Sequence, residues 1–314
     1  MLDLRRLQTL RAVAREGSLS AAARTLGYTQ PAISHQIARL EDEVGTALLT
    51  RLGRGVQLTD AGLALVEHAD AVLSRLSAAE EEVAAIAGLR AGRVRLAAFP
   101  SGSATLMAGA LTRLRADHPR VEVAFAEAEP EDALPLLRAG DLDLVLGFSY
   151  AAVGMREGAD LVALPLLRDP THALVRSGHP AAARNEPLAL EALAGETWIA
   201  GCERCRGHLL HVAAAAGFIP RIDFATDDHL TVQSLVAAGL GVSLLPALAL
   251  CAARRGDVAV LPVAGEPART VEVVMLTAER RPPAVTATLA ALRAAAQELV
   301  EAPQAAALGL TRAA

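Results

Sequence analysis

Residues 19–38 read LSAAARTLGYTQPAISHQIA, and these twenty residues decide the fold of the N-terminal region. Ala23 lies four residues before Gly27, and Ile33 follows six residues after that glycine. Two short crossing helices need a small residue at the crossing, a glycine in the turn and an apolar residue that locks the second helix onto the first. The spacing therefore predicts a helix-turn-helix, and a plain helical hairpin is the alternative.

The second helix of this pair, starting near residue 29, has an apolar face and a small polar face. At 100° per residue, Ile33, Ile37 and Leu40 cluster on one side. Short hydrogen-bonding side chains near a helix N-terminus suit base edges in the major groove, and hydroxyl groups suit phosphates. We therefore predict that this helix contacts DNA through the following residues: Thr29, Gln30, Pro31, Ser34, His35, Gln36 and Arg39.

A short basic turn follows the helix pair. Residues 48–51 and 56–58 are strand candidates on either side of Gly53-Arg54-Gly55, which predicts a hairpin, or wing. Arg51 and Arg54 would then suit contacts with phosphates or with the minor groove. A solvated basic turn with no partner is the alternative interpretation.

Thr59 is the expected cap of a long helix that runs to about residue 87. Its apolar residues recur in alternating steps of four and three, which is a heptad seam. The seam consists of Leu65, Ala69, Val72, Leu76, Ala79, Val83 and Ile86. Pairing of this seam with a second copy would give a dimer with twofold symmetry, which suits two DNA half-sites. Packing of the helix against its own chain is the alternative.

Residues 3–62 as a whole resemble the N-terminal domain of LysR-type transcriptional regulators. The resemblance covers the helix pair, the wing and the start of the long helix, and it departs at Leu10 and Leu19, where the family often has Phe. It implies a regulator that binds double-stranded promoter DNA as a homodimer or homotetramer, with RNA polymerase as a further partner. The expected domains are a winged helix-turn-helix at 1–58, a linker helix at 59–90, an effector-binding domain at 91–302 and a flexible tail at 303–314.

Composition and charge agree with a cytoplasmic DNA-binding protein. The chain has 314 residues, of which 53% are hydrophobic and 21% are charged, and its net charge is −5. Residues 1–58 carry eight Arg against five acidic residues, so only this part is basic and suits a polyanion. We expect no secretory signal and no membrane partner, because charges interrupt the N-terminus and no apolar run reaches ~18 residues.

Beyond residue 91 the pattern changes to short apolar strands that alternate with helices. Strands near 94–98, 121–126 and 142–147 are separated by helices, and a second set of elements begins near residue 166. Such alternation predicts an α/β fold with parallel sheets covered on both faces. The resemblance implies two Rossmann-like lobes, as in periplasmic binding proteins, with lobe I at about 91–165 and 264–302 and lobe II at about 166–263.

The resemblance also implies that a small-molecule effector binds between the lobes, where strand ends and helix N-termini converge. Amides and hydroxyls in the segment after the first strand suit an anionic effector. The expected effector-binding residues are Ser101, Gly102, Ser103, Ser149, Cys202, Arg204, Arg206, Thr226 and Asp228. Helix capping alone would also explain Ser103 and Asp228, and solvent exposure would explain either arginine.

Cys202, Cys205, His208 and His211 are spaced three residues apart. Three residues turn a helix by 300°, so the four side chains spread over half its circumference and cannot hold one metal ion. We therefore expect no metal site. Cys202 and Cys205 alone, at a helix start, would suit a redox pair, because a helix N-terminus favours the thiolate. Packing or lining of the effector pocket is the alternative.

Three classes of function compete for this chain: a DNA-binding regulator, a solute-binding receptor and an enzyme. The receptor interpretation leaves the first ninety residues and the expected lack of a secretory signal unexplained. The enzyme interpretation lacks a nucleophile elbow, a P-loop or a histidine and carboxylate at a suitable spacing. We therefore predict a regulator, and we assign no catalytic residues and no cofactor.

Overall fold

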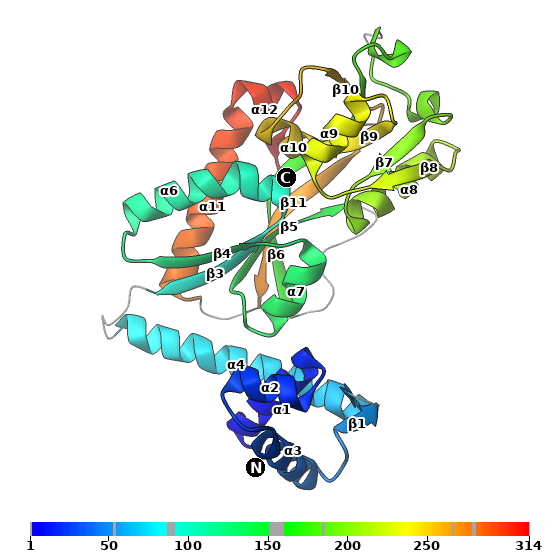
Figure 1. Ribbon diagram of the computed structural model, residues 1–314. Helices are drawn as coiled ribbons and strands as arrows, with labels where there is room; N and C mark the ends of the chain where they lie inside the picture. Colours follow the sequence, from blue (N-terminus) through cyan, green and yellow to red (C-terminus); the bar gives the residue numbers. More distant parts are fainter. Residues whose placement is uncertain are drawn as a thin grey trace. The chain divides into compact units, whose positions relative to one another are not determined.

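The computed structural model describes residues 2–52, 55–86, 92–150, 160–183, 186–265, 267–277 and 281–313. The chain divides into two units. Unit 1 is Met1–Gly92 with Leu134–Leu142, and unit 2 is Arg93–Ala133 with Asp143–Ala314 (Figure 1).

Unit 1 begins with three helices: α1 (Leu4–Glu16), α2 (Leu19–Leu26) and α3 (Gln30–Val44). The side chains of Asp3 and Ser18 cap α1 and α2 by accepting backbone N–H hydrogen bonds. Between α2 and α3, Gly27 has a φ of 70°, which a residue with a side chain rarely adopts. Ala23 and Ile33 are both buried in the shared core of the three helices. The predicted helix-turn-helix is confirmed.

A hairpin and a long helix come next: β1 (Leu49–Leu52), β2 (Gly55–Leu58) and α4 (Asp60–Ile86). The two strands pair antiparallel, which forms the predicted wing. Thr59 caps α4, because its Oγ1 accepts the N–H of Gly62 at 3.0 Å. A Cβ atom at Gly62 would lie 2.2 Å from the carbonyl oxygen of Leu48, so only glycine fits where the hairpin meets this helix.

A mixed sheet forms the frame of unit 2, with the strand order β4-β3-β5-β11-β6-β9-β7-β8 (Figure 1). Its strands are β3 (Arg93–Ala98), β4 (Glu122–Glu127), β5 (Leu144–Tyr150), β6 (Leu161–Arg176), β7 (Thr197–Ala200), β8 (Arg221–Ala225), β9 (Val242–Pro246), β10 (Val258–Pro262), β11 (Ala268–Leu276) and β12 (Thr311–Arg312). β3 is parallel to β4 and β5, and β7 is parallel to β8 and β9. These two parallel sets are the sheets of the two lobes, as the alternating pattern predicts.

The two long central strands, β6 and β11, depart from the predicted parallel arrangement. β11 pairs antiparallel with both β5 and β6, and β6 pairs antiparallel with β9 and β10. Strand β6 therefore reaches from one lobe into the other. A strand that enters the second lobe and one that returns from it must run in opposite directions, so the centre of the sheet is antiparallel.

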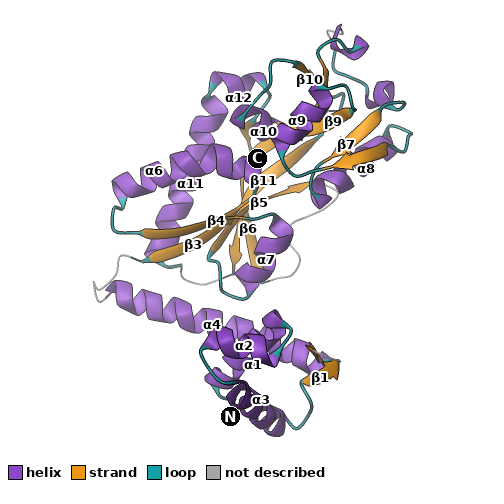
Figure 2. Ribbon diagram, viewed as in Figure 1, coloured by secondary structure: helices purple, strands orange, loops and turns teal. Residues whose placement is uncertain are grey.

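The helices that follow β3 in the sequence flank the strands, and α6 and α11 lie side by side (Figure 2). The helix bounds are α5 (Pro100–Gly102), α6 (Ala108–Asp117), α7 (Pro130–Arg138), α8 (Glu203–Ala215), α9 (His229–Ala237), α10 (Ala247–Ala252), α11 (Pro283–Glu301) and α12 (Pro303–Ala307), with a π-helical turn at Ser103–Met107 and 3-10 turns at Pro180–Ala183 and Leu190–Leu193. The larger core contains Phe99 and Phe148, and a second core surrounds Trp198. The larger core also includes Ile199 and Val232 of the second lobe, so it extends across both lobes beside the central strands.

The prediction of a flexible tail at 303–314 is wrong. Residues 303–307 form α12, and β12 pairs with β6 at Arg168 and Leu167. Ala305, Leu308 and Leu310 are buried. Three apolar residues in a short segment gave no clear period in the sequence, but their burial provides the free energy that orders this segment. No helix among the described residues combines the length and the apolar character that crossing a bilayer requires.

Candidate functional site

The exposed face of α3 carries most of the residues predicted to contact DNA. Thr29, Gln30, Pro31, His35 and Arg39 are exposed, and the side of the helix that faces the core is buried. The Nε2 of Gln30 donates a hydrogen bond to the Oγ of the half-buried Ser34 at 3.0 Å. The first turns of α3 therefore present short polar groups to solvent.

Gln36 is separated from this group. Its Oε1 accepts a hydrogen bond from the Oγ1 of Thr9, which is buried on α1. The carboxamide of Gln36 is therefore held between two helices of the same unit, where it stabilises their packing. The same hydroxyl also has the carbonyl oxygen of Arg5 as an acceptor at 2.9 Å, so Gln36 adds a contact between α1 and α3 that is independent of any ligand.

The wing is formed, but its basic tip is not described. Arg54 lies outside the described residues, and so does the side chain of Arg51. The backbone N–H of Val56 donates to the carbonyl oxygen of Gly17 at 3.1 Å, which holds β2 against the end of α1. The contacts predicted for both arginines stay a prediction.

The heptad seam of α4 divides into two parts. Leu65 and Ala69 pack against the core of unit 1, as the alternative interpretation of the seam predicts. Farther along the helix, Val72 is 47% exposed, Leu76 is 39% exposed and Val83 is 66% exposed. Ala79 is exposed as well, and the side chain of Ile86 lies outside the described residues. The second part of the seam is therefore an apolar stripe on the surface of the single chain.

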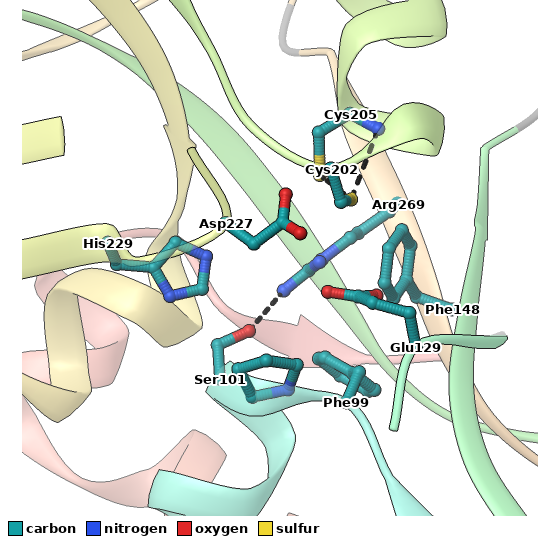
Figure 3. Close-up of a pocket in the computed structure, with 10 residues that line it drawn as sticks. Phe99, Ser101, Glu129, Phe148, Cys202, Cys205, Asp227, His229 and Arg269 are labelled. Atoms are coloured by element: carbon teal, nitrogen blue, oxygen red, sulfur yellow. Dashed lines mark hydrogen bonds between the residues drawn. The ribbon is translucent and has the colours of Figure 1, made fainter. Parts of the chain in front are cut away.

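A small cavity lies in unit 2 at the ends of several strands (Figure 3). Its lining residues are Phe99, Pro100, Ser101, Glu129, Phe148, Cys202, Cys205, Asp227, His229 and Arg269. Some of these residues come after strands β3 and β4 or belong to β5 in the first lobe. Others come after β7 and β8 in the second lobe, and Arg269 belongs to β11, so both lobes contribute. The cavity volume is about 10 Å³, which is room for about one water molecule.

Arg269 on β11 is the fixed positive charge of this cavity. It is 2% exposed, and its Nε donates to Oδ2 of the fully buried Asp169 at 2.8 Å. Its Nη2 donates to the Oγ of Ser101 at 2.7 Å (Figure 3). The guanidinium carbon lies 4.8 Å from the ring centre of Phe99 and 4.2 Å from that of Phe148, within the range of cation–π attraction. The arginine is thus paired, hydrogen-bonded and stacked, as a buried charge must be.

Two thiols face each other at the start of α8. Cys202 is the N-cap residue, and its Sγ accepts the N–H of Cys205 at 3.4 Å. The two Sγ atoms are 2.8 Å apart, and both cysteines are free thiols. The Sγ of Cys205 also lies 4.0 Å from the Oη of Tyr150 on β5. The pair therefore lies in a cavity to which both lobes contribute.

The pKa values of the two thiols are shifted in opposite directions. The hydrogen bond that Cys202 donates to the sulfur of Cys205 lowers the pKa of Cys205, and the charge of Arg269 acts in the same direction. The same hydrogen bond, together with burial, raises the pKa of Cys202. Two groups this close titrate as a pair, so the first proton is lost far more easily than the second.

Three other titratable groups near the thiols are shifted by burial. Burial raises the pKa of Glu129 to about 7, and its Oε2 has no hydrogen-bond partner among the described residues. Burial, followed by the charge of Arg269, lowers the pKa of His229 to about 4. Burial likewise lowers the pKa of His208 to about 4, and this ring stacks on Tyr150 with centroids 3.8 Å apart. At neutral pH both histidines are neutral.

Two of the nine predicted effector-binding residues, Ser101 and Cys202, line the cavity. The hydroxyl of Ser103 donates to the carbonyl oxygens of Ala98, the last residue of β3, and of Phe99, which precedes α5. Asp228 caps α9, since its Oδ1 accepts the N–H of Leu230 at 2.9 Å.

The other predicted positions lie outside the cavity lining. Gly102 is buried so close to the ring of Phe99 that a Cβ would lie 2.8 Å from it. The Oγ1 of Thr226 accepts the N–H of Asp228 at 3.3 Å, and Ser149 of β5 pairs with Thr270 of β11. Arg204 forms an ion pair with Glu131 of α7, and Arg206 is exposed.

Sequence reasoning missed the groups that define the cavity, above all Arg269, Glu129 and His229. One signal for Arg269 was present. An arginine near the start of a strand whose other residues are mostly apolar must either be paired or remain at the surface. Among the described residues, no cluster of three His, Cys, Asp or Glu side chains could hold a metal ion.

Comparison with known proteins agrees with both units. Residues 4–63 match the family described as bacterial regulatory helix-turn-helix protein, lysR family, and residues 87–297 match the LysR substrate binding domain. The hydrogen peroxide-inducible genes activator of Pectobacterium carotovorum subsp. carotovorum is 32% identical over 281 residues, covering 87% of this chain and 90% of that protein.

The DNA-binding transcriptional dual regulator OxyR of Escherichia coli (strain K12) is also 32% identical over 281 residues, covering 87% of this chain and 89% of that protein. The crystal structure of CbnR, a LysR family transcriptional regulator, is similar with a TM-score of 0.62 and 22% identity, covering 94% of this chain and 99% of that one. The chain belongs to the LysR family of bacterial transcriptional regulators.

Proposed function

We propose that this LysR-family regulator binds promoter DNA as a dimer that associates further into a tetramer, and that it acts in the cytoplasm without enzymatic turnover. In this proposal α3 enters the major groove and the wing contacts the backbone. The observation that carries the proposal is the exposed, short and polar face of α3, opposite a fully buried apolar face. One related structure, full-length CbnR, was solved in complex with its target DNA.

The charge distribution supports the same role for unit 1. Residues 1–58 carry a net +3, and the rest of the chain carries −8. A basic surface of modest size provides sequence-independent affinity for phosphates, and an acidic remainder keeps other surfaces away from DNA. The exposed Arg39 on α3 is a phosphate contact in this proposal.

The exposed part of the α4 seam supports self-association. Val72, Leu76 and Val83 occupy one stripe with heptad spacing and remain accessible in the single chain. A second α4 with the same stripe would cover these side chains through an interface with twofold symmetry. Two copies of α3 would then face two half-sites of one operator.

The cavity of unit 2 supports a role in receiving a signal. It holds a buried arginine, two thiols and a carboxylate oxygen for which the described residues offer no hydrogen bond, and residues of both lobes line it. A ligand or a chemical change there would favour one arrangement of the lobes over another, which is the requirement for control at a distance. The proposed effector is therefore a small polar molecule that suits a volume of about 10 Å³.

The test of the DNA-binding proposal starts from the native, reduced full-length protein. It is incubated with fragmented DNA of its own genome, and the retained fragments are sequenced and then used in gel shifts. We expect retained fragments to lie upstream of genes and to contain an interrupted palindrome. We expect them to bind at least ~10³-fold more tightly than random DNA at the same salt concentration. Equal affinity for retained and random fragments would contradict the proposal.

A further inference from the structure

We propose that His35 on α3 reads a guanine in each half-site of the operator, and that this contact strengthens as the pH falls below neutrality. The inference rests on the proposed DNA-binding function and deepens it, because it names the base, the reading group and the condition that tunes the contact. It follows from the contacts that the other polar side chains of α3 already make within the chain.

Three polar side chains in the first half of α3 are engaged inside the protein. Gln36 is held against α1 by the hydroxyl of Thr9. Gln30 and Ser34, one turn apart, share a hydrogen bond of 3.0 Å and are therefore bound to each other before any DNA arrives. A side chain that contacts its own chain has fewer donors and acceptors to offer to a base edge.

His35 has no such contact and lies on the outward side of α3. Among the described residues, none forms a hydrogen bond with its imidazole ring. His35 is exposed, and so are Pro31 one turn before it and Ala38 about one turn after it. Residues at these spacings share one side of a helix. Because the proline and the alanine are short and carry no side-chain donor, α3 can approach the base pairs closely there, and the imidazole is the group that reaches their edges.

The chemistry of the imidazole ring selects guanine. In the major groove guanine presents two acceptors, N7 and O6, whereas adenine presents the acceptor N7 beside a donor, its N6 amino group. A protonated imidazole has only donors, so it forms a charge-assisted hydrogen bond at the guanine edge and is repelled by the adenine amino group. A neutral ring also carries an acceptor and discriminates less. His35 therefore favours guanine, most strongly in its protonated form.

The surroundings of His35 contain charges of both signs. On the outward side of α3, Arg39 lies one turn away and Asp42 lies two turns away. Helices α1 and α2 pack against the opposite, apolar side of α3, and Arg6 of α1 forms an ion pair with Glu43 of α3. The other charged residues of these three helices are Arg5, Arg11, Arg15, Glu16, Arg24 and Glu41.

Bound DNA adds negative charge to these surroundings. Opposite charge near an imidazole favours its protonated form, so the phosphates of the half-site promote proton uptake by His35. Histidine is the side chain whose charge ordinarily changes between pH 5 and pH 8. Binding to the operator is therefore coupled to the gain of a proton, and the preference for guanine grows as the pH falls.

His68 provides a matched control within the same unit. Residues 1–92 contain two histidines, His35 and His68, and both are exposed. His68 lies on α4, outside the helix-turn-helix, so its protonation adds the same charge without a position on α3. General attraction between histidine and phosphates would involve either residue, whereas reading of a base depends on His35 alone.

The experiment selects binding sites from a library of random duplexes with the full-length protein, at about pH 6 and at about pH 8. We expect the parent to select guanine at one position of each half-site. Replacement of that guanine by adenine should weaken binding at about pH 6 by about fivefold or more, the lower end of what one mismatched base pair costs. The same replacement should cost less at about pH 8. Gel shifts on the selected site and on random DNA, at one salt concentration, give the affinities.

Substitutions of His35 separate base reading from a structural role. His35→Asn should move the preference at that position from guanine to adenine, because an asparagine amide bonds adenine through two hydrogen bonds. His35→Arg should keep guanine at both pH values, since arginine stays charged and bonds guanine in the same bidentate way. His35→Ala should lose the preference, and His68→Asn should behave as the parent. Circular dichroism verifies that each variant is folded.

Two results would overturn the inference. One is a folded His35→Ala protein that selects the same guanine as the parent. The other is a parent protein whose preference for guanine stays the same at both pH values or changes equally in His35→Arg. In either case the parent still binds its selected site, so the DNA-binding function stands and only the role of His35 fails. If the parent selects no site at all, the proposed function fails, and reading by His35 fails with it.

Discussion

At the scale of single residues, the interior of unit 2 depends on the charge of Arg269. Replacement with Met would leave Asp169 buried and unpaired, which costs about 3–5 kcal/mol of unfolding free energy. Trp198 is the one tryptophan of the chain and is fully buried in unit 2, so its fluorescence during urea unfolding measures this loss. Adding Asp169→Asn should restore part of the stability. Arg255→Met, which removes an exposed ion pair with Asp257, should change the midpoint little.

A second residue-scale prediction concerns His208. Its pKa is about 4 in the folded chain and about 6.5 when unfolded, so the folded state binds fewer protons between these values. The folded state is therefore fully stabilised above pH 6.5 and loses stability as pH falls toward 4. Between pH 7 and pH 5 the loss from His208 is about 2 kcal/mol. His208→Phe keeps the stacking on Tyr150 and should reduce the pH dependence of unfolding by that amount. The same pH slope in both proteins would contradict this assignment.

Ser34 allows a residue-scale test of base reading. If its hydroxyl contacts a base edge, Ser34→Ala should lose about 1–3 kcal/mol of binding to the target site and much less to random DNA. Ser234→Ala removes an equally small hydroxyl from an exposed position on α9 and is the matched control. Gel shifts across a range of salt concentrations separate the two kinds of loss. Equal losses on both DNAs would show that Ser34 does not read sequence.

At the scale of elements, local periodicity predicted the helices and strands that pack against near neighbours in the chain. The three first helices, the wing and α4 were predictable, because each buries one apolar face beside neighbours that are close in sequence. The antiparallel centre of the sheet was not predictable from local periodicity, because β6 and β11 are far apart in sequence and pair only in the folded chain. The cavity obeys the same rule. Ser101 and Cys202 come directly after strands and were predictable, whereas Arg269 reaches the site from a strand distant in sequence.

The α4 seam gives an element-scale prediction. Leu76→Asp would place a charge in the middle of the apolar stripe and should convert the dimer to a monomer, because an unpaired buried carboxylate is costly. Ala71→Asp adds the same charge to another exposed position of α4, off the seam, and should leave the oligomer intact. Sedimentation velocity distinguishes the two species. An unchanged oligomer in Leu76→Asp would show that the copies pair elsewhere.

The C-terminal segment gives another prediction for an element. Removal of residues 303–314 would expose the surface that buries Leu308 and Leu310 and would unpair the edge formed by β12. Burial of two leucines corresponds to roughly 3–5 kcal/mol, so the unfolding midpoint of unit 2 should fall markedly. The variant Thr311→Ala, which keeps both leucines, serves as the control. A truncated protein with the parent's Trp198 unfolding curve would contradict the packing role.

At the scale of the whole molecule, the two units differ in the sequence distance of the contacts that build them. The helix-turn-helix is built from neighbouring segments, so its sequence alone identifies it. The cavity of unit 2 is assembled from loops and strands that span residues 99 to 269. Its chemistry is therefore set by tertiary structure. Of the predicted effector-binding residues, Ser101 and Cys202 line the cavity, whereas the charge of Arg269 comes from a strand distant in sequence.

The long strand β6 also has a consequence for the synthesis of the chain. The strands that pair with it, β9, β10, β11 and β12, all come later in the sequence. During translation β6 therefore leaves the ribosome before any partner exists, with both edges open and most of its first half apolar. Helices α1 to α3, in contrast, are consecutive and can pack as they emerge. The three N-terminal helices can therefore fold early in translation. The sheet of unit 2 folds later, and β6 must be protected from aggregation until β11 is synthesised.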